Sequence, residues 1–269
     1  MSLGIVICSP EGVVLAAESR VTLTAETPPD PPIHVSYDNA TKVLSFNRPH
    51  DFVGVVTYGL AAIGLRTANS YASEFEATLP PKRISVDDFA SRLSTFFMDQ
   101  WKAAMPPDYQ GPPMTFVVGG FNEKQAYGRV FLFDIPSAPL PAIRGAEGEF
   151  GITWGGQRNQ VDRLLQGFDA ELPNALIAEL QLTPDQQAKM PQVLGRFQMP
   201  APIQAMALQD CVDLAIFFVR TTIAAQALTV GIRGCGGPID VATITRDGGM
   251  SFVQQKQLRG EQGTLAMVR

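Results

Sequence analysis

Two short apolar runs near the N-terminus constrain the fold of this chain more than any other feature. The runs span residues 3–8 and 13–17, and they flank the segment SPEG at 9–12. Proline presets φ at the first central position of a turn, and glycine tolerates a positive φ at its end. The pattern therefore predicts a β-hairpin whose strands bring Ser2, Glu18 and Arg20 to one end.

The composition predicts a single large domain. A chain of 269 residues with 45% hydrophobic content can bury a substantial core, and layered folds of mixed helix and strand commonly reach this length. The net charge of −5 argues against broad nucleic-acid binding, which needs a basic surface. The three cysteines are far apart, which disfavours a disulfide framework and a zinc knuckle. We therefore expect a reducing, cytoplasmic compartment.

Membrane, cofactor and metal sites are not expected. No basic N-terminal stretch precedes a long apolar segment, and polar residues interrupt the longest apolar run, 213–230, which we interpret as a buried helix. No glycine-rich phosphate loop opens a helix. Asp210 and Asp213 share a predicted helix face with no histidine nearby, so a metal site is not indicated.

The rest of the chain divides into strands and paired helices. Alternating or buried apolar runs predict strands at 41–46, 52–58, 114–120, 128–135, 149–154, 239–245 and 251–257. Helical spacing and caps predict helices at 60–79, 85–105, 157–168 and 203–228. Four prolines within 28–32 predict a stiff loop that edges a binding cleft.

The order of these elements predicts the α+β class. Helices come in consecutive pairs between groups of strands, which favours two antiparallel sheets packed face to face over a doubly wound parallel sheet. With helices on both outer faces, this is a four-layer αββα sandwich. We expect one domain over 1–269, with a proline-rich insertion near 27–34 and a less regular helical segment near 169–202.

Several segments resemble proteasome β-type subunits, which belong to the N-terminal-nucleophile (Ntn) hydrolases. The run 12–20 (GVVLAAESR) resembles the family's second strand, with Glu18 at the position of an aspartate. An ungapped alignment then puts Ser2 at the catalytic N-terminal threonine. The sequence TKV, with Lys42, resembles the segment of the catalytic lysine, and the turn at Gly59 resembles the oxyanion-hole turn. Glycine-rich segments at 154–156 and 236–242 resemble later turns of the same fold.

The resemblance implies a role for each of these residues. Ser2 would be the nucleophile, and its own α-amine would be the base once Met1 is removed. The charge of Lys42 would lower the pKa of the Ser2 hydroxyl, and Glu18 would hold Lys42 in place. The N–H of Gly59 would face the oxyanion. Two further residues would line the cleft, Thr57 and Thr22, with Thr22 pairing its backbone with an extended peptide.

The sequence departs from the family pattern at three places. Glu18 is one methylene longer than the family's aspartate. Gly156 stands where the family has a serine near the terminal amine, and Ile232 and Cys235 stand where it has an aspartate and a serine. These supports of the amine are therefore absent, or other residues supply them.

Three functions stay open at this level. The resemblance favours hydrolysis of peptide or amide bonds through an acyl-enzyme on Ser2, in a homo-oligomer such as a ring, with an unfoldase partner unspecified. The departures favour a non-catalytic ring or scaffold protein. A small-molecule amidase is the third, with the proline insertion narrowing its cleft. A Ser-His-Asp triad from His34 and His50 lacks the nucleophile-elbow motif.

Overall fold

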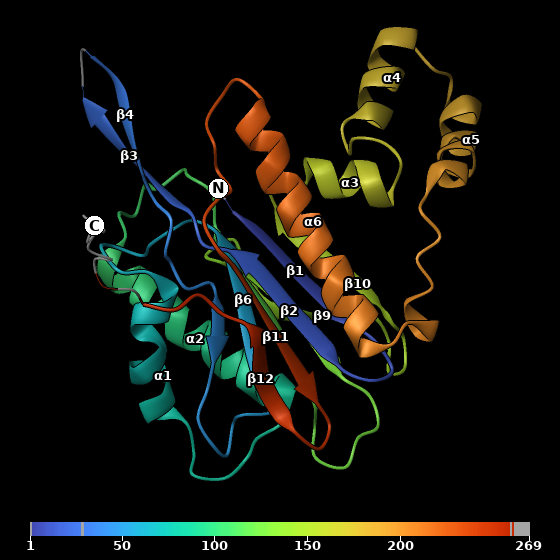
Figure 1. Ribbon diagram of the computed structural model, residues 1–269. Coiled ribbons are helices and arrows are strands. Elements are labelled where there is room, and N and C mark those ends of the chain that lie inside the picture. Colours follow the sequence, from blue (N-terminus) through green and yellow to red (C-terminus); the bar gives the residue numbers. More distant parts are fainter. Residues whose placement is uncertain (1, 28–29, 259, 261–269) are drawn as a thin grey trace, which may run out of the picture.

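Two five-stranded antiparallel sheets form the centre of the molecule (Figure 1). The computed structural model describes residues 2–27, 30–258 and 260, and for 24–32 it describes no side chains. The first sheet has the order β10-β1-β2-β11-β12. Its strands are β1 (Leu3–Cys8), β2 (Val13–Glu18), β10 (Gly151–Gly156), β11 (Ile239–Thr245) and β12 (Gly249–Gln254). The predicted N-terminal hairpin is confirmed, because β1 pairs with β2 along its length.

The second sheet has the order β5-β6-β7-β8-β9. Its strands are β5 (Val43–Ser45), β6 (Val53–Gly59), β7 (Met114–Gly120), β8 (Arg129–Ile135) and β9 (Ala138–Ile143). Strand β9 was not expected, because prolines at 139 and 141 interrupt its sequence. It lies at the edge of the sheet, where a missing N–H donor is tolerated.

Helices pack on the outer faces of the two sheets. Helix α2 (Val86–Ala104) packs on β7, β8 and β9, and Phe75 of α1 (Ala72–Thr78) contacts Phe89 of α2. Helix α6 (Leu208–Leu228) packs on β1, β2 and β11, with α3 (Asn159–Leu165) against it. Apolar side chains of both sheets, among them Leu15 and Val56, fill the space between the sheets. The first sheet therefore lies between α6 and the second sheet (Figure 1).

The predicted 60–79 helix is wrong over its first half. Residues 60–67 form an irregular loop, followed by a short 3₁₀ turn at Ala68–Tyr71 and then by α1. Gly64 has φ +58°, which a right-handed helix cannot contain, and the buried Ile63 pairs with Arg66 across this turn. This loop borders the site described below.

The predicted proline loop is also wrong. Strands β3 (Val21–Thr27) and β4 (Asp30–Tyr37) form a separate two-stranded hairpin, although Pro28 and Pro29 lie outside the described residues. Each strand of such a hairpin is an edge strand, so prolines at 31 and 32 remove no bond that a central strand would need. Figure 1 shows this hairpin projecting from the body of the molecule.

Residues 169–202 form short helices, as expected. The two main ones are α4 (Leu172–Leu180) and α5 (Pro184–Leu194), and neither contains a buried residue. Within the described chain, α6 is the one helix long and apolar enough, by length and composition, to cross a membrane. Its buried side chains, such as Phe218 and Val219, pack into the cluster against the first sheet.

Candidate active site

Ser2 lies at the start of β1, held by the end of β10. The N–H of Gln157 donates to the carbonyl oxygen of Ser2 at 2.7 Å. Gly156 directly precedes this contact and has φ +87°, and a Cβ on it would lie 1.8 Å from the same carbonyl oxygen. The family's serine therefore has no room at Gly156, because only glycine fits this close turn.

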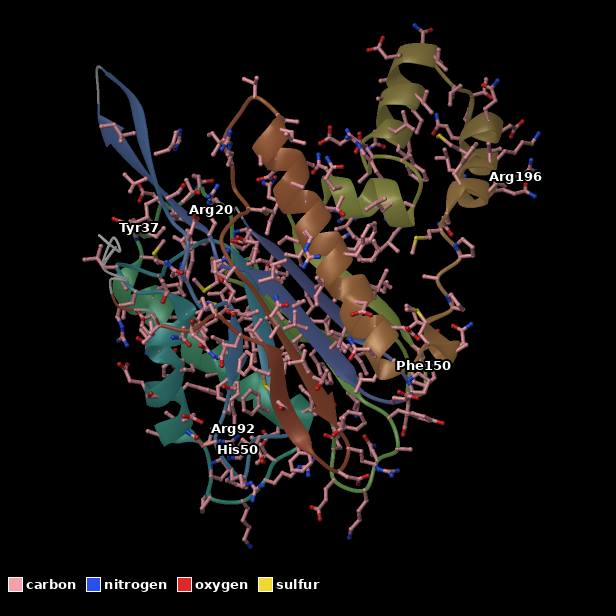
Figure 2. The ribbon with its side chains drawn as sticks, in the orientation of Figure 1. Arg20, Tyr37, His50, Arg92, Phe150 and Arg196 are labelled. Atoms are coloured by element: carbon pink, nitrogen blue, oxygen red, sulfur yellow. The ribbon has the colours of Figure 1, made fainter. Side chains whose placement is uncertain are left out.

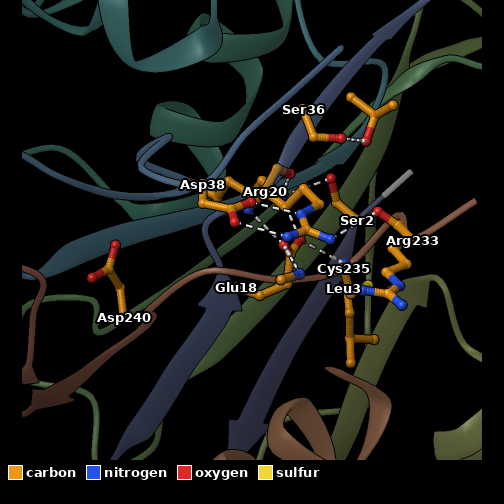
Figure 3. A network of polar contacts seen from close by, with 12 residues as sticks. Ser2, Leu3, Glu18, Arg20, Ser36, Asp38, Arg233, Cys235 and Asp240 are labelled. Atoms are coloured by element: carbon orange, nitrogen blue, oxygen red, sulfur yellow. Dashed lines mark hydrogen bonds and ion pairs between the residues drawn. The ribbon is translucent and has the colours of Figure 1, made fainter. Parts of the chain in front are cut away.

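Lys42 reaches Ser2 from the neighbouring sheet. Its Nζ donates to Ser2 Oγ at 2.9 Å, and also to a carboxylate oxygen of Glu18 and to the carbonyl oxygen of Arg20. Figure 3 shows Ser2, Glu18 and Arg20 gathered in one network of polar contacts. Lys42 directly precedes β5 of the second sheet, whereas Ser2 directly precedes β1 and Glu18 ends β2 of the first sheet. The packing of one sheet on the other therefore joins the three side chains that the sequence predicted to lie together.

Glu18 is the anchor of this cluster. One carboxylate oxygen accepts from Leu3 N at 3.3 Å and from Lys42, and the other accepts from Arg20 N at 2.7 Å and Gly236 N at 3.1 Å. Its side chain is buried, and each oxygen has two donors. A buried charge needs such partners, and four donors from separate segments hold Glu18 in one position.

Burial also changes the acid–base character of Lys42. Removal of the ammonium from water lowers the pKa of Lys42 below its usual value, and the adjacent Glu18 carboxylate opposes that effect. The Lys42 ammonium therefore loses its proton more easily than that of an exposed lysine. While it is charged, it lies close enough to Ser2 Oγ to act on it electrostatically.

Gly59 ends β6 with φ +86°. The N–H of Leu60 donates to Pro113 O on the β7 side at 2.9 Å. Because consecutive N–H groups of a strand point to opposite sides, the N–H of Gly59 points toward the β5 side. Strand β5 begins only at Val43, and within the described residues we find no acceptor for this N–H. It is a free donor at the end of the sheet where Ser2 lies.

A small cavity of about 20 Å³ lies beside Ser2 and Lys42, with room for roughly one water molecule. Thr57 lines it, and its buried Oγ1 has no partner among the described groups. Thr22 is not among the residues that line it: its hydroxyl lies 3.1 Å from that of Ser36 on the β3–β4 hairpin. The structure thus brings Thr57 to the site and leaves the Thr22 side chain outside the cavity.

Sequence reasoning missed the Arg20–Asp38 ion pair. The guanidinium donates twice to the carboxylate, at 2.6 and 2.7 Å, and once to Arg233 O at 3.3 Å. Through its side chain and its carbonyl oxygen, Arg20 joins the segment before Lys42 to the loop after α6. The sequence placed Arg20 near Ser2, but no local pattern identified Asp38 as its partner.

Two glutamines form a second connection that the sequence did not reveal. Gln226 of α6 donates to the side chain of Gln157 at 2.9 Å and accepts from Cys235 N at 2.8 Å. It therefore links the segment that holds Ser2 to the loop whose Gly236 holds Glu18. Gln157 directly follows Gly156, and Gln226 bonds Cys235, so this connection joins two of the positions at which the sequence departs from the family pattern.

The residues at the family's support positions take other roles. The Cys235 thiol is buried, and its burial, reinforced by Glu18, raises its pKa to about 12, so it is a poor nucleophile. Ile232 is half exposed. His50 does not reach this site: its ring lies within hydrogen-bond distance of Pro80 O, and Figure 2 shows it far from Arg20.

Comparisons with known proteins identify the fold. No family model and no curated protein matches the sequence. Among solved structures, a mutant of Anbu from Hyphomicrobium sp. strain MC1 matches with a TM-score of 0.54 and 13% identity, over 95% of this chain and 86% of that one. Anbu (ancestral beta-subunit) from Yersinia bercovieri matches with a TM-score of 0.53 and 13% identity, over 95% and 88%. At this identity the likeness shows the fold alone, which is α+β and proteasome-like.

Proposed function

We propose that this protein is an Ntn hydrolase of the four-layer αββα type that cleaves peptide or amide bonds through an acyl-enzyme on Ser2. The contact of 2.9 Å between Lys42 Nζ and Ser2 Oγ is the observation that favours this function most. An ordinary ion pair between a lysine and a glutamate on the surface would be exposed, and it would not need a serine hydroxyl beside the lysine. Here the lysine, its carboxylate and the hydroxyl are all buried next to a cavity.

The α-amine of Ser2, freed when Met1 is removed, is the base in this proposal. Ser2 Oγ attacks the carbonyl carbon and its proton passes to the amine, whose unperturbed pKa is about 7.7–8.0. The substrate C–N bond then breaks, the amine returns the proton to the leaving nitrogen, and an ester to Ser2 remains. Water attacks this ester and gives a proton to the same amine. The C–O bond to Ser2 then breaks, the ammonium returns the proton to Ser2 Oγ, and a carboxylic acid is released.

The other residues stabilise these steps. The Lys42 ammonium lowers the pKa of the Ser2 hydroxyl, and Glu18 positions Lys42. The free N–H of Gly59 would donate to the oxyanion, an interaction worth about 3 kcal/mol in comparable sites. The unpaired Thr57 hydroxyl would bind the substrate within the cavity. The backbone of β3 at Thr22 would pair with an extended peptide.

Intact mass and covalent labelling test the proposal. We expect the native protein to lack the mass of one methionine residue and to add one equivalent of a β-lactone or epoxyketone probe at Ser2. Lys42→Ala should reduce labelling and amide hydrolysis by at least about a hundredfold. The exposed Lys102, which pairs with Asp99 at 3.7 Å, is the matched control, and Lys102→Ala should label normally. Native protein that retains Met1 and takes no label contradicts the proposal.

Two other functions have specific observations in their favour. The glycine at 156 and the half-exposed Ile232 fit a non-catalytic ring or scaffold subunit. The small size of the cavity beside Ser2, about 20 Å³, favours a small-molecule amidase over an enzyme that takes large side chains there. The name "ancestral beta-subunit" of one structural neighbour supports self-association of this chain. Light scattering after gel filtration tests that, and fractionation tests the cytoplasmic location that we also propose.

A further inference from the structure

Gln226 lies on the last turn of α6, in line with the side chains that this helix buries against the first sheet. The buried positions Ala215, Phe218 and Thr222 recur at helical spacing, and Gln226 follows Thr222 by four residues. At this point the side chain meets Gln157, the residue directly after β10, rather than an apolar neighbour. A polar side chain thus continues the packed face of α6 where that face reaches the end of the sheet.

Both hydrogen-bonding sides of the Gln226 amide are used. The backbone N–H of Cys235 can only donate, so the oxygen of the Gln226 amide must face it, and the distance is 2.8 Å. The nitrogen then faces Gln157 and donates to the side-chain oxygen of that residue at 2.9 Å. The backbone of Cys235 therefore fixes the orientation of both glutamine amides.

The two ends of this connection reach the two halves of the candidate site. At one end, the backbone N–H of Gln157 donates to Ser2 O at 2.7 Å. At the other end, Cys235 is followed by Gly236, whose N–H donates to Glu18 at 3.1 Å. One amide, that of Gln226, therefore lies between the segment that holds Ser2 and the segment that holds Glu18.

Gln226 also closes the loop that carries Gly236. Residues 227–233 are exposed, and the chain becomes buried again at 234–236. The bond from Cys235 N to Gln226 joins the two ends of this exposed loop. Arg20 also reaches the loop, but through an exposed bond of 3.3 Å to Arg233 O. The position of Gly236 therefore depends on the partly buried bond at Gln226 more than on the loop itself.

We propose that Gln226 is a positioning residue, which sets the separation between Ser2 and the Glu18–Lys42 pair and so aligns Ser2 Oγ for attack. The inference rests on the proposed function of Ser2. Gln226 touches neither the nucleophile nor the lysine, and it acts through Gln157 and Cys235. A small displacement of a nucleophile slows the reaction strongly and need not weaken binding. Its loss therefore changes the rate of the chemical step and leaves affinity unchanged.

The rate of covalent labelling at Ser2 tests this role. Gln226→Met keeps the length of the side chain and removes both hydrogen bonds. With the β-lactone probe, we expect the maximal labelling rate to fall about tenfold while the probe concentration at half-maximal rate stays the same. Gln209→Met is the matched control, because Gln209 lies on the same helix and bonds Asp213 at 3.0 Å on the exposed surface. It should leave both constants unchanged.

A double variant tests whether the connection acts as a unit. Gln226→Met already breaks both bonds, so the further change Gln157→Met should slow labelling no more. If the two losses multiply instead, each glutamine acts independently and the assignment is overturned.

Amide hydrogen exchange separates this proposal from the hydrolase proposal, because it needs no turnover. The Gln157 amide, which donates to Ser2 O, should exchange about tenfold faster in Gln226→Met, and the Val6 amide in the middle of β1 should not change. Faster exchange at Gln157 with no labelling of wild type keeps the positioning of Ser2 and overturns the hydrolase. Labelling of wild type with an unchanged rate in Gln226→Met, or unchanged exchange at Gln157, overturns the positioning role and leaves the hydrolase.

Discussion

The buried charged cluster beside Ser2 and the β3–β4 hairpin are built on opposite principles. In the cluster, Glu18 and Lys42 are charged, buried and held by donors and acceptors from four separate segments. On the hairpin, Leu23, Val35 and Tyr37 are apolar and exposed, on a two-stranded sheet that is independent of both large ones. Polar groups are thus hidden and apolar groups are open, which reverses the usual arrangement of a globular surface.

This difference assigns the two regions different tasks. The charged cluster keeps one geometry, because moving any partner would leave a buried charge without compensation. The hairpin contributes little to the core, so its exposed side chains, such as Leu23 and Tyr37, add little to the stability of the fold. We therefore expect changes in the charged cluster to reduce stability or activity strongly, and changes on the hairpin to reduce stability little. The predictions follow from the largest expected effect to the smallest.

Removal of the Glu18 carboxylate should have the largest effect. Glu18→Ala removes the counter-charge of the buried Lys42 ammonium and the acceptor that the N–H groups of Leu3, Arg20 and Gly236 share. We expect the free energy of unfolding to fall by about 3–5 kcal/mol. Glu74→Ala removes a carboxylate from the exposed pair with Arg66 and should cost less than about 1 kcal/mol. Urea denaturation measures both. Equal losses would mean that the buried pair is no more important than a surface one.

A side chain at Gly156 should have the next largest effect. Gly156→Ala puts a Cβ against Ser2 O in a left-handed conformation, so we expect a loss of about 2 kcal/mol or more together with loss of labelling at Ser2. Gly195 has a right-handed helical φ of −58° and open space around it. Gly195→Ala should therefore be neutral or stabilising by about 0.4–1 kcal/mol. A stable, active Gly156→Ala would refute the close turn.

The pH dependence of hydrolysis should reveal the buried lysine. If the Lys42 ammonium is needed, raising the pH through its pKa removes the charge, and kcat/KM falls about tenfold per pH unit above it. Because burial lowers the pKa of Lys42, this decline should begin below the usual lysine value of 10.5. A profile measured from pH 6 to 10.5, with circular dichroism to follow folding, tests this. A rate that stays flat to pH 10.5 would exclude a role for the ammonium.

Substitution on the hairpin should have the smallest effect on stability. Val35→Thr replaces an exposed apolar side chain with one of similar shape, and we expect a change within about 0.5 kcal/mol. Val55→Thr, at a buried position of β6, is the matched control and should cost clearly more. If the two variants lose equal stability, the hairpin face is covered in solution.

Much of the fold could be predicted from local patterns. The helix of 86–104 begins where Ser85 caps it, with Asp88 N donating to its hydroxyl at 3.1 Å. The predictions were wrong where a local rule of secondary structure has a known exception. Prolines that exclude a central strand are tolerated on edges, so β4 and β9 were missed. Apolar residues at 60–67 suggested a helix, but Gly64 turns the chain instead.

For the candidate site, the sequence by itself determined that Ser2, Glu18, Lys42 and Gly59 end their strands, because hydrophobic alternation and turn residues are local signals. Only the tertiary structure decided which partners they have. The Arg20–Asp38 pair and the Gln157–Gln226–Cys235 chain join segments with no common local pattern. Such contacts depend on how one sheet packs on the other and on where α6 ends, and hydrogen-bond partners across those distances follow from geometry that no short stretch of sequence contains.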